Sequence, residues 1–242
     1  MAKAAGKPSE QTQEQAQPAE KQVEKQEKTP KREPGGQIVS AWQFSLATVA
    51  ALLIGALYLL LPDALLVGPR WLLLVIEVAL LSPPVLARLS NSHLPRQVSR
   101  GFAYALLAAL TLELILSLAK LVTNLSSLPP RLLLIPGILL WSANVLIFAS
   151  WYWETDGDGP ASRHHAGHEA ADFQFPQQQG GNTRGWRAGF IDYLFLAFCT
   201  ATALSPADTV PLSRRAKLLM MVEAVISMIV IILLLARFVN IV

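Results

Sequence analysis

Long apolar runs are the feature that most constrains this sequence. Four of them match the roughly 17 to 25 apolar residues that a helix needs to cross a bilayer, at 42–61, 71–87, 101–122 and 132–153. A fifth run occupies 216–242. Only a structure that satisfies its own backbone hydrogen bonds tolerates hydrocarbon, and runs of this length do so as helices. The fold class that we predict is therefore an all-α membrane protein.

The composition agrees with this fold class. Hydrophobic residues make up 52% of the 242 residues and charged residues 15%, which is not typical of a soluble domain. Residues 1–40 are instead rich in Lys, Glu, Gln and Pro. They hold too few large apolar side chains to offset the entropy of ordering, so we predict a disordered polar tail.

The Lys and Arg residues near the run ends predict an orientation. The side that carries the tail holds ten of the counted cations, at positions 25, 28, 31, 32, 88, 96, 100, 163, 184 and 187. The opposite side holds Arg70, Lys120 and Arg131. We expect the protein in the bacterial inner (plasma) membrane. Because the more basic side of a membrane protein faces the cytoplasm, we expect the tail to be cytoplasmic. Basic residues placed this way suit lipid headgroups, and we expect no nucleic-acid partner.

The last third of the sequence is harder to interpret. After a four-helix membrane region at 41–153, residues 154–188 are rich in Gly, Gln and His, which is typical of a mobile cytoplasmic loop. The apolar run at 193–203 is too short to span. We predict that 189–242 forms a re-entrant or interfacial half-helix followed by the final transmembrane helix. This gives about five spans, and the alternative is six.

Acidic side chains inside a bilayer are costly and therefore candidates for function. Glu77 and Glu113 lie at similar depth on neighbouring predicted helices, so we predict an intramembrane carboxyl pair that shares one proton. In the alternative, each carboxyl binds separately within the bundle. Asn144 is predicted to bond between helices.

The stretch at 192–208 and the final helix supply a candidate ion pathway. Glu223 and Ser227 are four residues apart and share one helix face. The predicted pathway residues are Asp192, Thr200, Thr202, Ser205, Asp208, Glu223 and Ser227. The alternative is a plain helical hairpin, in which the hydroxyl and carboxyl groups only cap helix ends.

Enzymatic and metal-binding motifs are not evident in the sequence. With one cysteine, Cys199, a multi-cysteine zinc site is excluded. His164 and His168 are spaced for a metal on a helix, but the glycines around them favour a solvated loop. The "DGDG" at 156–159 lacks the later acidic ligands of a calcium loop. We therefore expect no enzyme activity, no metal and no cofactor.

Two resemblances follow from the C-terminal half. "NVLIFASWYWETDGDGP", "FQFPQ" and "WRAGFIDYLFLAFCTATALSPADTVPLSRRAK" resemble a family of bacterial multi-pass integral-membrane proteins. That family carries W-x-W before an acidic Gly-Pro turn, then D-Y-L-x-x-A-F, S-P-x-D-T and R-x-A-K. The resemblance covers about 144–241. Because that family has no established activity, the resemblance implies topology without a mechanism.

The second, weaker resemblance is to the pore region of two-helix potassium channels. It would place the pore helix at 192–198, the filter at "TATALSPADTVP" and the inner helix from Ala216. Leu204, Ser205 and Pro206 stand where that family has Gly-Tyr-Gly. A potassium filter needs the backbone freedom of those glycines, so we expect no potassium selectivity.

Together these features predict a multi-pass inner-membrane protein with a channel-like or transporter-like ion pathway along 192–208 and the last helix. The alternative is a structural or partner-binding membrane protein without transport activity. The expected partner is the lipid bilayer. A homo-oligomer and a cytoplasmic partner for the tail or the His-rich loop are further alternatives that the sequence leaves open.

Overall fold

A computed structural model describes residues 35–90, 95–124, 131–165, 169–181, 185–202 and 209–239. The chain divides into two units, Met1–Ala41 and Trp42–Val242. Most of the predicted tail lies outside the described residues. A helix begins at Gly35, inside the segment predicted as tail.

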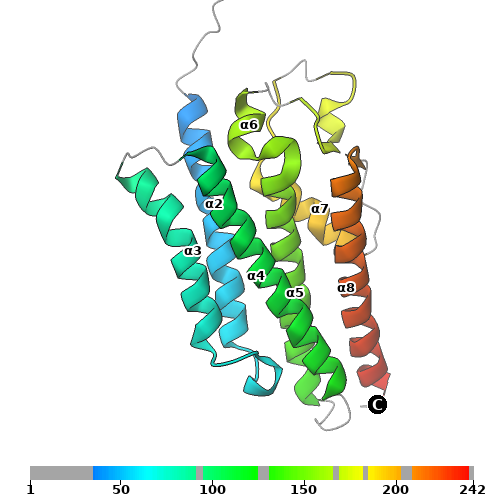
Figure 1. Ribbon diagram of the computed structural model, residues 1–242. Coiled ribbons are helices and arrows are strands. Elements are labelled where there is room, and N and C mark those ends of the chain that lie inside the picture. The colour runs from blue at the N-terminus through cyan, green and yellow to red at the C-terminus, as the bar shows by residue number, and fades with distance from the viewer. Residues whose placement is uncertain are drawn as a thin grey trace, which may run out of the picture. The chain divides into compact units, whose positions relative to one another are not determined.

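The described residues are almost entirely helical, which confirms the all-α fold class. Seven helices are α2 (Gly35–Leu59), α3 (Trp71–Leu89), α4 (Arg96–Thr123), α5 (Arg131–Thr155), α6 (Pro160–His165), α7 (Phe190–Thr202) and α8 (Arg214–Val239). The strands are two residues each, β1 (Phe173–Gln174) and β2 (Val210–Pro211). Figure 1 shows these helices, coloured from blue to red along the chain.

Three helices are long and apolar enough to cross a membrane, judged by length and composition. They are Gln97–Thr123, Leu133–Asp158 and Arg214–Ala236. Three further apolar helices are shorter within the described residues, at Leu46–Leu59, Trp71–Ala87 and Phe190–Thr202. The structure thus confirms candidate spans in α4, α5 and α8, whereas the predicted count of five goes beyond it.

Helix α5 is the centre of the packing in the second unit. Its apolar window is 61% buried, against 39% for α4 and 22% for α8. It packs against α4, α7 and α8 (Figure 1). One cause of the close α5–α8 approach is Gly137, because a Cβ placed there would lie 2.4 Å from Cδ2 of Leu234. Small residues allow helices in membranes to pack closely.

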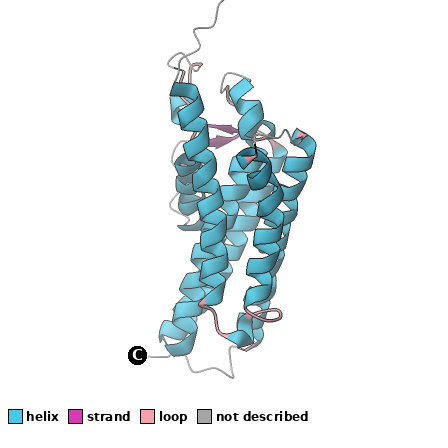
Figure 2. Cartoon of the chain, turned by 90° about the vertical axis from the view of Figure 1, so that its left-hand side faces the viewer, coloured by secondary structure: helices cyan, strands magenta, loops and turns pink. Residues whose placement is uncertain are grey.

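The chain returns after α7 to the end from which it entered. Strands β1 and β2 pair antiparallel, with Phe173 opposite Pro211. The Leu212 amide also donates to the Asp172 carbonyl at 2.8 Å. Figure 2 shows this strand pair near the end of the helices opposite the C-terminal label. Helix α7 therefore does not carry the chain to the other end of the bundle, and α8 starts where α7 started.

The segment predicted as a mobile loop, 154–188, contains ordered contacts where the structure describes it. It forms α6, β1 and a short 3-10 helix, Pro176–Gln178. Asp156, Arg163 and Phe173 are among its buried residues. We name the residues 154–181 and 209–213, as far as they are described, the cap.

Candidate functional site

The predicted pathway residues divide into three groups in the structure. Thr200, Glu223 and Ser227 meet where α7 and α8 pack on α5. Asp192 and Thr202 make local contacts at the two ends of α7. Ser205 and Asp208 lie outside the described residues. The junction of α5, α7 and α8 is therefore the candidate site.

Glu223 is the central residue of this junction. Its side chain is fully buried, and its Oε2 accepts a hydrogen bond from the Tyr152 hydroxyl of α5. The Thr200 side chain also contacts that hydroxyl. The Asn144 amide donates to the Glu223 backbone carbonyl at 3.4 Å. Oε1 of Glu223 and Oδ1 of Asn144 have no hydrogen-bond partner among the residues that the structure describes.

Ser227 joins the three helices one turn further along α8. Its hydroxyl donates to the Ala201 carbonyl of α7 at 2.5 Å and accepts from the Trp141 indole of α5 at 2.9 Å. Ala201 lies in the last turn of α7, and helix C-termini carry a partial negative charge. The arrangement thus places a buried carboxyl within one turn of the negative C-terminal end of α7.

The two remaining described pathway residues, Asp192 and Thr202, form hydrogen bonds within α7 or at its start. The Asp192 carboxylate accepts from the Gly189 amide at 2.7 Å, a contact that caps the helix start. The Thr202 hydroxyl donates to the Phe198 carbonyl at 2.8 Å. Neither hydrogen bond links α7 to α8. Among the described residues, only those at the Glu223 junction therefore remain candidates for the predicted pathway.

Glu77 and Glu113 contact different groups. Oε1 of Glu113 accepts from the Val67 amide at 3.2 Å and from the Ser117 hydroxyl at 3.4 Å. Glu77 is fully buried and lies against α2, where a Cβ at Gly55 would be 2.0 Å from its Oε2. The shared proton stays a prediction, and these contacts fit the alternative in which each carboxyl binds separately.

The cap contains functional-group contacts that the sequence did not reveal. Asp156 is 3% exposed. Its Oδ1 accepts from the amides of Asp172 and Phe173 at 2.9 and 3.2 Å, and its Oδ2 from the Tyr193 hydroxyl at 2.5 Å. The Arg163 guanidinium lies over the rings of Trp153 and Tyr193, 4.6 and 5.1 Å from their centroids. These contacts fix the cap to the start of α7.

The "DGDG" turn also has a structural use. Asp158 pairs with Arg100 at 3.2 Å and with Arg215 at 3.7 Å, so its charge is matched by arginines from α4 and α8. Gly157 and Gly159 have φ values of 56° and 96°, which favour glycine. Within the described part of the chain, no group of three His, Cys, Asp or Glu side chains could hold a metal ion. The side chains of His164 and His168 lie outside it.

No family model, curated protein or solved structure matches this chain. The resemblances of its C-terminal half therefore stay predictions.

Proposed function

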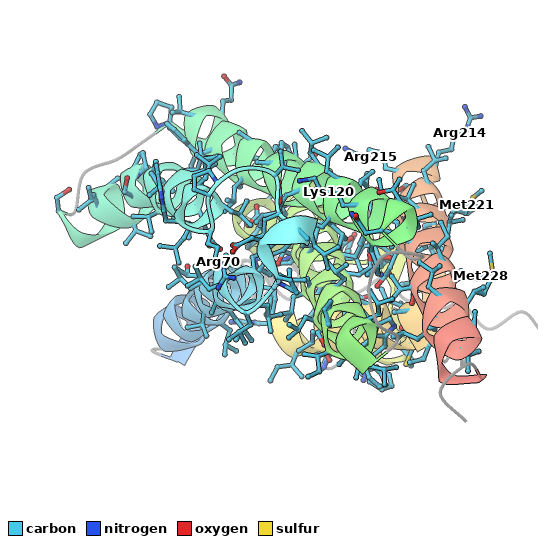
Figure 3. The ribbon with its side chains drawn as sticks, turned by 90° about the horizontal axis from the view of Figure 1, so that it is seen from below. Arg70, Lys120, Arg214, Arg215, Met221 and Met228 are labelled. Carbon is cyan, nitrogen blue, oxygen red and sulfur yellow. The ribbon has the colours of Figure 1, made fainter. Side chains whose placement is uncertain are left out.

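We propose that the protein is a multi-pass protein of the bacterial inner membrane that moves protons through a site at Glu223. The three candidate spans support a membrane location. So does the outer face of α8, where Met221 and Met228 are 63% and 55% exposed and point away from the other helices in Figure 3. Lipid would cover such a face.

In the proposed topology α2, α3, α4, α5 and α8 cross the membrane and α7 re-enters. The β1–β2 pairing supports re-entry, because it brings the chain back to its entry end. Arg163 belongs to the cap, and Arg100 and Arg215 form ion pairs with it. Arg70 belongs to the 62–70 loop at the other end, and Lys120 binds that loop. Because cytoplasmic ends carry more Lys and Arg, the cap would face the cytoplasm.

The observation that carries the proposal is the Glu223 carboxyl beside the C-terminal end of α7. One of its oxygens accepts a hydrogen bond, and the other has no partner among the described residues. A carboxylate buried without a cation is costly in a membrane, and none of the ion pairs of the described residues involves Glu223. Half-helix C-termini form cation and proton sites in transporters. A Glu223 carboxyl that takes up a proton would avoid the cost of a buried charge. By releasing the proton again, it would act as a proton site at the C-terminal end of α7.

The test is proton flux in vesicles reconstituted with the purified full chain. A pH-sensitive dye inside the vesicles reports flux under an imposed gradient. Glu223→Gln keeps the shape of the side chain but cannot carry the proton, so we expect the flux to fall to the level of empty vesicles. Asp63→Asn, an exposed acid in the 62–70 loop, is the matched control and should leave the flux unchanged. Wild-type protein without proton flux across a range of pH and voltage would refute the proposal.

One set of contacts favours a second candidate, a structural membrane protein without transport. The bonds of Trp141 and Ser227 join α5, α7 and α8 and need no mobile ion. In that case wild-type vesicles would show no flux, while Glu223→Gln would alter only the melting temperature. The two candidates therefore give different results in the same pair of measurements.

A further inference from the structure

A small cavity lies between α2, α3 and α4, beneath the loop that joins α2 to α3. Its volume is about 30 Å³, and its lining includes Tyr58, Val67, Leu73, Ile76 and Glu113. On the loop side the lining residue Val67 is 40% exposed, whereas Tyr58 on the inner side is 1% exposed. The cavity thus leads from the surface to a fully buried hydroxyl.

The charged groups around the cavity all have hydrogen-bond partners in the protein. Arg70 donates to Asp63 in the loop at 3.0 Å, and this guanidinium holds the pKa of the Asp63 carboxyl below its usual range. Lys120 donates to the Leu66 carbonyl. Glu113 receives the Val67 amide and the Ser117 hydroxyl. Two cations and two carboxylates balance, so the cavity does not require an additional ion.

The Tyr58 hydroxyl is the group in the cavity wall that lacks a hydrogen-bond partner of normal geometry among the described residues. It is buried, with the Ser117 side chain beside it. A hydroxyl both donates and accepts, while the Glu113 carboxylate only accepts. The chemistry therefore calls for a small neutral molecule that can accept from Tyr58 and donate to Glu113.

Water has these properties. A polar cavity needs roughly 10 to 15 Å³ to hold one water molecule, and buried waters make 2 to 4 hydrogen bonds to groups that are otherwise unsatisfied. We propose that this cavity is an internal water site that joins Tyr58 to Glu113 and opens toward the loop between α2 and α3. Such a water would let Glu113 exchange protons with the solvent at that end. The inference is independent of Glu223.

Radiolytic hydroxyl-radical footprinting of the full chain in detergent tests the site, because radicals formed from a bound water oxidise the side chains next to it. We expect Tyr58 to be oxidised at least several-fold faster than Tyr152 and Tyr193, which are equally buried but do not line the cavity. Leu65, 0% exposed in the same loop and outside the lining, should stay unmodified. Tyr58 oxidised no faster than these controls would overturn the proposal.

A cavity-filling variant gives the second measurement. Leu73→Phe adds a ring where the water would lie, so the oxidation of Tyr58 should fall to the level of Tyr152. A conservative Leu73→Met variant should keep most of it. Oxidation of Tyr58 that persists in a folded Leu73→Phe protein would assign the labelling to local opening and contradict a bound water. If Leu73→Phe does not fold, the comparison among the three tyrosines in the wild type still decides.

Discussion

Buried acidic side chains in this protein differ in how many hydrogen bonds they receive. Asp156 accepts three, Glu223 accepts one, and both oxygens of Glu77 are without a partner of normal geometry among the described residues. A fully bonded carboxylate stabilises the fold, whereas an incompletely bonded one invites a functional explanation. Asp156 is thus the group on which we expect the cap to depend most.

Replacing Asp156 with Asn should destabilise the protein much more than replacing Asp158 with Asn. The first change weakens charge-assisted hydrogen bonds at a buried position, each worth about 1.5 to 3 kcal/mol. The second removes exposed ion pairs, which contribute about 0 to 1 kcal/mol. Chemical unfolding in detergent, followed by tryptophan fluorescence, measures both. Equal losses would show that the Asp156 contacts do not hold the cap.

Helices are the level at which the sequence is most informative here. The apolar runs at 101–122, 132–153 and 216–242 correspond to α4, α5 and α8, because length and apolarity are local properties. The Asp156 contacts could not be foreseen, since its partners at 172, 173 and 193 are distant in sequence, and the first two lie in a segment of loop-like composition. For the same reason, the sequence placed Glu223 and Ser227 on one face but did not identify Tyr152 as the donor to Glu223.

The approach of α5 to α8 depends on the absence of a side chain at Gly137. A methyl group there would lie 2.4 Å from the Leu234 side chain, so Gly137→Ala should displace that side chain and cost about 1 to 3 kcal/mol. Gly101 of α4, where a Cβ would meet nothing within 4 Å, is the control. Gly101→Ala should be neutral or stabilising by up to about 1 kcal/mol, because alanine favours a helix. Thermal melting distinguishes them, and a similar response to both would contradict the close contact.

The whole molecule has two ends that an impermeant maleimide can distinguish in intact cells. In a Cys199→Ser background, we expect Ala64→Cys to react from outside. Gln177→Cys, in the cap, should react only after permeabilisation. Both positions are exposed, so lack of reaction reports sidedness rather than burial. Labelling of Gln177→Cys in intact cells would reverse the proposed orientation, and labelling of both from one side would exclude the topology.

The pairing of β1 with β2 makes α7 an insertion in the chain. Because Gln174 and Val210 are direct partners in the antiparallel ladder, a two-residue Asn-Gly turn could join them. The backbone route from α5 to α8 would then survive without residues 175–209. Such a shortened chain would keep the remaining helices and lack α7, the helix that brings Ala201 to Ser227. It would therefore show which properties of the protein depend on α7.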